Sequence, residues 1–272
     1  MLTTLLPALM RRSAVQARFV LLGSLGLLAG LQVVIVGQAS ALEEAHGFSR
    51  MAELVPAFLQ RGLGNKSFLL VTFKGTVAFG YFHPVVATLV AVLAIYFVTE
   101  LAHEVESGLV DVTLARSVPR HVVVTRSLLL ATGAVAGAMV LMAAGTQMGL
   151  RLFGSPEFDP PSAAVNARLL LHLAGVGWCF AGFGLAVAAG ARRWNTAFTA
   201  ATLTAVLMYL LDFLAIGWPL LRPIAWISPF HYYPALSIVA GDAPASRNLA
   251  ILFSAAAGFS ALGYWRFNRR DL

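Results

Sequence analysis

The chain has 272 residues, of which 59% are hydrophobic and only 11% are charged. An average soluble domain is about 45–50% apolar and about 25% charged, so this composition excludes a single soluble core and indicates a chain whose solvent is mostly lipid. The net charge of +7 would suggest nucleic acid in a soluble protein. In a membrane protein without a basic soluble fold it indicates basic cytoplasmic loops instead, and we expect no nucleic-acid partner.

The first long apolar run, residues 19–39, follows Arg11, Arg12 and Arg18. This order resembles a secretory signal peptide, and residues 38–41 are compatible with a cleavage site. The run is longer than the apolar region of a signal peptide, so we interpret it as an uncleaved first membrane span.

Six segments are apolar and long enough to cross about 30 Å of hydrocarbon at a rise of about 1.5 Å per residue. We predict spans at residues 19–39, 80–99, 124–148, 168–190, 197–217 and 248–266. Glycines are frequent in the third and fourth spans, and small residues let helices approach closely, so we expect a tight bundle. The predicted fold class is an all-α polytopic membrane protein, with residues 1–272 forming a single transmembrane domain.

An even number of spans places both termini on one side of the membrane. The face that carries the termini holds 11 Lys and Arg residues in short segments, and the other face holds 8 in much longer loops. Because short cytoplasmic loops are enriched in Lys and Arg, this density predicts cytoplasmic termini in a multi-pass protein of the inner or plasma membrane.

Two of the outer loops show a pattern of their own. Residues 51–63 carry apolar side chains at helical spacing, which is compatible with a helix on the membrane surface. Residues 218–247 contain tryptophans, tyrosines and prolines, namely Trp218, Trp226, Tyr232 and Tyr233 with Pro219, Pro223, Pro229 and Pro234. This combination favours a broken or re-entrant helix near the interface.

The segment from Glu100 to Arg126 joins the second and third predicted spans. Acidic and polar side chains recur at helical spacing beside an apolar stripe, so we predict an amphipathic cytoplasmic helix that ends before Pro119. Anionic inner-leaflet lipids attract basic faces, so an acidic face favours docking on a protein over a connector that rests on lipid headgroups.

Three stretches lie in order along the chain: Glu104–Gly108 with Leu114–Arg120, Ile227–Tyr233, and Arg266–Leu272. They resemble, respectively, the coupling segment, the S-P-F-x-Y-Y stretch and the F-x-R-R-D-L ending of ABC-2 type transporter permeases, the six-helix membrane subunits of bacterial ATP-binding-cassette exporters. Ser and Pro are exchanged about Val118 relative to the family's P-V-S-R-like turn, and residues 1–18 lack the acidic residues of the family's N-terminal helix.

The resemblance implies a permease domain that forms the translocation pathway with a second permease subunit, identical or different, among membrane lipids. It also implies two copies of a cytoplasmic ATPase that dock on the segment between the second and third spans. The residues implied in ATPase coupling are Glu104, Glu106, Gly108, Asp111, Arg116, Pro119 and Arg120.

The sequence contains no recognisable catalytic machinery. The nearest approach to a phosphate-binding loop, Gly62–Ser67, has Asn65 where a glycine must precede the lysine, so ATP hydrolysis is expected in a separate subunit. His103-Glu104 begins like a zinc-protease motif, but Ser107 stands at the position of the second histidine. We expect no catalytic residue, no metal and no cofactor.

Asp212 is the one acidic residue inside a predicted span. Acids at such positions are costly and often functional, although near an interface Asp212 is also compatible with a solvated role. We treat Asp212, together with His231, Tyr232 and Tyr233, as candidates for a substrate path. The alternative function is a membrane scaffold or assembly factor that docks a cytoplasmic partner without transport.

Overall fold

The computed structural model describes residues 2–53, 56, 60, 63–115, 118–242 and 246–270, and its regular elements in these ranges are all helical. Within them, six stretches are long and apolar enough to cross a membrane. These are α2 (Arg18–Glu44), α5 with α6 (Phe73–Phe82 and Pro84–Glu106), α8 (Arg120–Phe153), α9 (Ala163–Ala188), α10 (Trp194–Gly217) and α12 (Ser246–Asn268). The chain has the architecture of a multi-pass membrane protein, as composition predicted.

Shorter helices connect these stretches. They are α1 (Leu2–Gln16), α3 (Gly47–Glu53), η1 (Gly64–Val71), α7 (Leu109–Leu114), η2 (Pro219–Ile227), η3 (Pro229–Tyr232) and α11 (Ala235–Ala240). The two 3₁₀ helices η2 and η3 occupy the proline-rich loop for which we predicted a broken helix. Most of the predicted surface helix at residues 51–63 lies outside the described residues.

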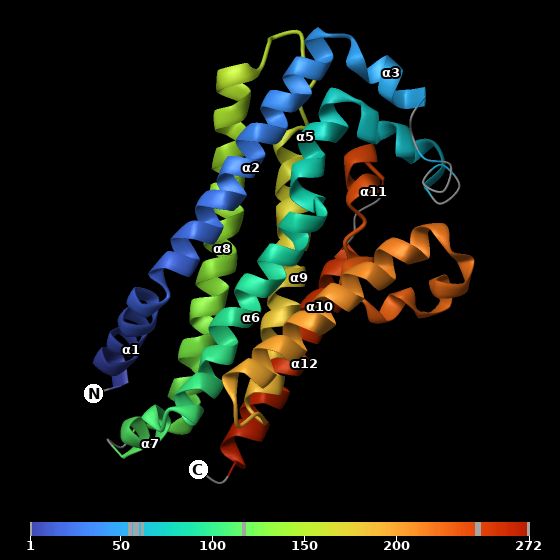
Figure 1. Cartoon of the computed structure of the whole chain (residues 1–272). Coiled ribbons are helices and arrows are strands. Elements are labelled where there is room, and N and C mark those ends of the chain that lie inside the picture. Colours follow the sequence, from blue (N-terminus) through green and yellow to red (C-terminus); the bar gives the residue numbers. More distant parts are fainter. Residues whose placement is uncertain are drawn as a thin grey trace.

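Both ends of the described chain lie at the same end of the bundle (Figure 1). This arrangement agrees with an even number of crossings. The side of the membrane on which the termini lie stays a prediction from the distribution of Lys and Arg.

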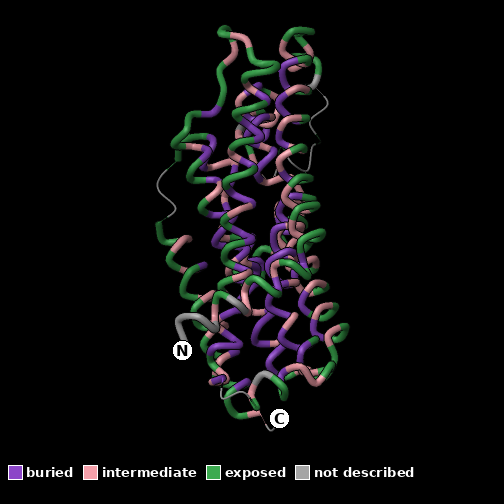
Figure 2. Tube along the Cα trace, turned by 90° about the vertical axis from the view of Figure 1, so that its left-hand side faces the viewer, coloured by how far each residue is buried: buried purple, intermediate pink, exposed green. Residues whose placement is uncertain are grey.

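Helix α9 lies at the centre and packs against α6, α8, α10 and α12. In its most apolar stretch 72% of the residues are buried, whereas in the corresponding stretches of α10 and α12 only 17% and 11% of the residues are buried. Buried residues accordingly concentrate in the interior and exposed ones on the outside (Figure 2). The outward faces of α10 and α12 are apolar, which suits contact with lipid or with a second membrane subunit.

Glycines permit close contacts between helices, in agreement with the tight bundle predicted from the small residues of the spans. A Cβ atom at Gly145 would lie 2.4 Å from the carbonyl oxygen of Ala29, where α8 crosses α2. A Cβ atom at Gly182 would lie 2.6 Å from the carbonyl oxygen of Ala256, where α9 crosses α12. Lipid provides no hydrophobic force between helices, so this close backbone packing is a main source of their association.

The second predicted span is not one continuous helix. It breaks at His83–Pro84, where His83 has an extended ψ of 136° and proline starts α6. A proline has no N–H, and the residue before it avoids the helical region. The carbonyls of Gly80 and Tyr81 therefore lose the helical donors that residues 84 and 85 would supply.

Side chains from other segments of the chain satisfy both carbonyls. Gln32 of α2 donates from Nε2 to the Gly80 oxygen at 2.7 Å, and Tyr233 donates from its hydroxyl to the Tyr81 oxygen at 3.2 Å. The Tyr81 hydroxyl in turn donates to Thr146 of α8 at 2.7 Å. Because unpaired backbone groups are costly where water is absent, these bonds stabilise the break and join α2, α5 and α8.

We predict that Gln32→Leu destabilises the protein by about 1–3 kcal/mol, because it leaves the Gly80 carbonyl buried without a donor. The loss should be smaller in a Pro84→Ala background, where residue 84 regains an N–H that can bond the same carbonyl. The free energy of unfolding in detergent, from titration with a denaturing detergent, measures both effects. Gln38→Leu, at an exposed position of the same helix, serves as the control, and equal losses from Gln32→Leu in both backgrounds would contradict the assignment.

Candidate functional site

The segment predicted as one amphipathic helix is divided in the structure. Helix α6 continues to Glu106, Gly108 turns the chain with a φ of +70°, and the six-residue α7 follows. Glycine enters this left-handed conformation without the steric penalty of a Cβ atom, so it commonly ends helices. The single coupling helix is therefore not confirmed, and Gly108 is the sequence signal that could have indicated its division.

Glu104, one of the residues implied in ATPase coupling, lies inside the bundle. Its carboxylate accepts two hydrogen bonds from Arg126 of α8, Nη1 to Oε1 at 2.6 Å and Nη2 to Oε2 at 2.8 Å. Its role in ATPase coupling stays a prediction. The side chains of Glu104 and Arg126 are only 9% and 2% exposed, respectively. Buried charges require such a partner, so this ion pair joins α6 to α8 inside the bundle.

Glu106 and Asp111 lie at the surface of the same end. Glu106 accepts a 2.9 Å hydrogen bond from the backbone N–H of Trp194, the first residue of α10. A carboxylate is favourable at a helix N-terminus, where N–H groups are unpaired. Asp111, in the first turn of α7, is exposed and is the predicted acid that is best placed to meet another protein.

Arg120 contacts the C-terminal part of its own chain. Its Nη1 donates to the carbonyl oxygen of Arg270 at 2.6 Å and to that of Asn268 at 3.2 Å. Two of the three stretches that carried the family resemblance thus meet at the end of the bundle where the termini lie. Pro119 precedes the first residue of α8, as expected, and Arg116 lies outside the described residues.

A polar hollow of about 780 Å³ opens at this end between α6, α7 and the C-terminal segment. Its charged lining residues are Glu106, Asp111, Arg192, Arg193, Arg266 and Arg270. Burial and the neighbouring charge of Arg192 lower the pKa of Arg270 from its usual value. This end therefore presents a concentrated positive charge beside the acidic α7.

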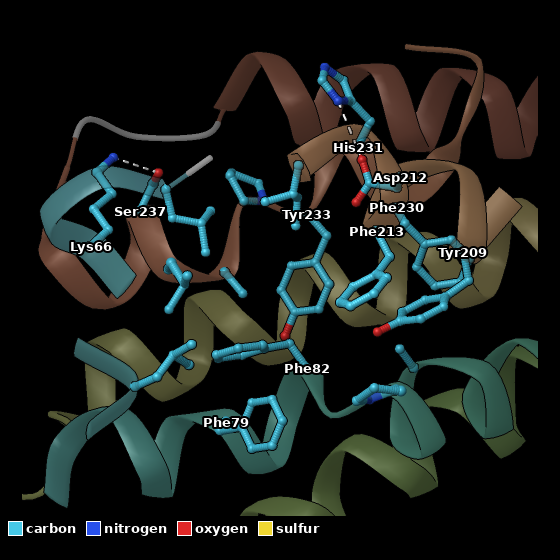
Figure 3. A pocket seen from close by; sticks show the side chains of 18 residues that line it. Lys66, Phe79, Phe82, Tyr209, Asp212, Phe213, Phe230, His231, Tyr233 and Ser237 are labelled. Atoms are coloured by element: carbon cyan, nitrogen blue, oxygen red, sulfur yellow. Dashed lines mark hydrogen bonds and ion pairs between the residues drawn. The ribbon is translucent and has the colours of Figure 1, made fainter. Parts of the chain in front are cut away.

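The second candidate site lies between α5, α6, α10, η3 and α11. A cavity of about 600 Å³ is lined by Asp212, His231 and Tyr233, three of the four residues predicted for a substrate path. Oδ1 of Asp212 lies 3.5 Å from Nδ1 of His231 (Figure 3). The fourth residue, Tyr232, does not line the cavity and donates its hydroxyl to the carbonyl oxygen of Trp226 at 2.9 Å.

The opposite wall of this cavity was not predicted from the sequence. Phe79 and Phe82 of α5 and Lys66 of η1 complete the lining. They lie about 130 residues or more before Asp212 in the sequence, and nothing in the local pattern of either segment indicates their proximity.

Comparison with known protein families gives no match, and comparison with curated proteins gives none either. Among the residues that the structure describes, no three His, Cys, Asp or Glu side chains are grouped so as to hold a metal ion.

We predict that Glu104→Leu and Arg126→Leu each destabilise the protein by about 3–5 kcal/mol, because each leaves its partner as an unpaired buried charge. The double variant should lose less than the sum of the two, since neither member of the pair is then left without the other. Titration of the purified protein with a denaturing detergent measures these free energies, with Glu157→Leu in the exposed α8–α9 loop as the control. Losses that simply add in the double variant would mean that the two side chains are independent.

Proposed function

We propose that this chain is the transmembrane permease subunit of an ATP-driven transporter of the ABC-2 type, working as an exporter. Six candidate spans with both termini at one end support this proposal, as does the family resemblance of three separate stretches. The observation that carries it furthest is the contact of Arg120 with the carbonyls of Asn268 and Arg270. It brings the coupling-like segment and the C-terminal motif together beside α7.

Helix α7 is the docking element in this proposal. Asp111 and Val112 are exposed on it, with Val112 56% exposed. An exposed apolar residue beside an acid suits contact with a protein better than contact with an anionic lipid surface. The docked partner is a P-loop ATPase, because this chain has no phosphate-binding loop of its own.

Three internal bonds connect the neighbourhood of α7 to the spans. The Glu104–Arg126 pair fixes α6 to α8, Glu106 fixes α6 to the start of α10, and Arg120 fixes α8 to the end of α12. A displacement of α7 by the ATPase would therefore be passed to four spanning helices together. Two such permeases, each with its own ATPase, would rock against one another across the pathway between them.

The cavity beside Asp212 favours transport over the alternative of a membrane scaffold. A scaffold needs a docking surface but no internal chamber, whereas a permease must accommodate its cargo within or between its subunits. The chamber and the docking helix α7 lie in different parts of the chain. A transporter that couples ATPase docking to the movement of its cargo requires two such separate sites.

We predict that the tagged protein, purified from its native membrane in mild detergent, retains a P-loop ATPase in equal stoichiometry. Asp111→Lys should reduce the retained ATPase about tenfold, because a reversed charge at a docking surface is repelled by the partner. Quantitative mass spectrometry of the purified complex measures both.

Glu157→Lys, at an exposed loop position near the other end of the chain's third span, is the matched control and should leave the complex intact. Recovery of the wild-type protein without any ATPase would contradict the permease function. Normal recovery and normal ATP turnover with Asp111→Lys would instead remove α7 from the docking surface.

A further inference from the structure

The walls of the 600 Å³ cavity are unusually rich in aromatic rings. Helices α5, α10 and η3 and the residue after η3 supply six of them, namely Phe79, Phe82, Tyr209, Phe213, Phe230 and Tyr233 (Figure 3). Some of these rings pack against one another. The rings of Tyr209 and Phe230 pack edge to face with centroids 5.2 Å apart, and those of Phe79 and Phe82 pack in the same way with centroids 5.2 Å apart. Packed rings of this kind form a preformed chamber, and its volume lies in the range of about 300–1,000 Å³ that is usual for ligand pockets.

The positive charge in the lining is already compensated. Lys66 forms an ion pair with Asp242, which is not a lining residue, and donates a hydrogen bond to Ser237 at 2.9 Å. Lys66 lies at the end of the chamber opposite Asp212 (Figure 3). It therefore neither neutralises Asp212 nor offers an uncompensated charge to an anion.

The negative charge in the lining is less well compensated. His231 lies 3.5 Å from one carboxylate oxygen of Asp212, a distance longer than that of a well-formed hydrogen bond. Arg222, in the 3₁₀ helix that follows α10, directs its guanidinium to the carbonyls of Ala215 and Ile216 instead. Asp212 is 28% exposed, so a carboxylate faces a small, largely apolar chamber.

These features specify the ligand. A carboxylate in an apolar environment is stabilised by a cation, and the faces of aromatic rings attract cations as well. An anion would meet Asp212, and a hydrophilic cation would lose its water without gaining the apolar contacts. We propose that this cavity binds an organic cation with an apolar, aromatic body, with its charge beside Asp212 and its body against the rings of α5 and α10.

The binding proposal does not require an ATPase. The further step, that such a cation is the cargo, rests on the proposed permease function. The two can fail separately, because binding is measured on the purified chain alone and ATPase association is measured on the native complex.

Tetraphenylphosphonium and tetraphenylborate form a matched pair of probes, since they have nearly the same size and shape and opposite charge. We expect radiolabelled tetraphenylphosphonium to bind the purified protein saturably, and tetraphenylborate not to displace it. Equal displacement by the two probes would overturn the proposal, because it would show that apolar surface alone, or partition into detergent, accounts for the binding.

Variants test the residues. Asp212→Asn preserves the shape of the side chain and should weaken tetraphenylphosphonium binding at least about tenfold, which corresponds to about 1.4 kcal/mol. Phe79→Leu removes one aromatic face and should weaken binding about threefold or more. Asp159→Asn, at an exposed acid in the α8–α9 loop, is the matched control and should bind as the wild type does.

Thermal unfolding followed by tryptophan fluorescence checks that each variant is folded. Folded Asp212→Asn with wild-type affinity would overturn the proposal. If Asp212→Asn does not fold, Phe79→Leu and the comparison of the two probes decide the question, because neither alters the acid.

Discussion

A hydrocarbon interior contains no water to complete a missing hydrogen bond, and this constraint organises the bundle. Several buried polar groups have partners in other segments of the chain. Glu104 is paired with Arg126, Gln32 with the carbonyl of Gly80, and Tyr233 with the carbonyl of Tyr81. Because these bonds join separate segments of the chain, the requirement that polar groups be paired also helps to specify which segments are neighbours.

Glycines supply the remaining specificity. Where α8 crosses α2 and where α9 crosses α12, only a residue without a Cβ atom fits against the facing backbone. Contacts of this kind depend on position along both helices, so they fix the register of each pair. The outward faces of α10 and α12 are largely exposed, and their apolar surface is where lipid or another subunit would lie.

Hydropathy alone predicted the six spans, because the length of an apolar run is a property of one segment and needs no knowledge of its neighbours. The predicted coupling helix is divided at Gly108 because helical periodicity in the sequence continues across a glycine at which the backbone turns. The burial of Glu104 could not be predicted for a related reason. Helical spacing placed Glu104 on the polar face of the predicted helix, but whether Arg126 covers that face depends on how α6 and α8 are rotated.

The cavity illustrates the same limit. Asp212 could be selected from the sequence because an acid within an apolar run is conspicuous by itself. Phe79 and Phe82 could not be selected in this way, since phenylalanine is common in membrane spans. The local sequence does not indicate which residues lie across the bundle from them. Only the packing of α5 against the segment that carries Tyr233 brings these residues into one chamber.

The break at His83–Pro84 has a mechanical consequence. Tyr233 belongs both to the wall of the cavity and to the break, since its hydroxyl bonds the carbonyl that the break exposes. The helix break and the chamber therefore share one hydrogen bond. A change that breaks this bond would both free the hydroxyl of Tyr233 in the chamber wall and leave the carbonyl of Tyr81 without its donor.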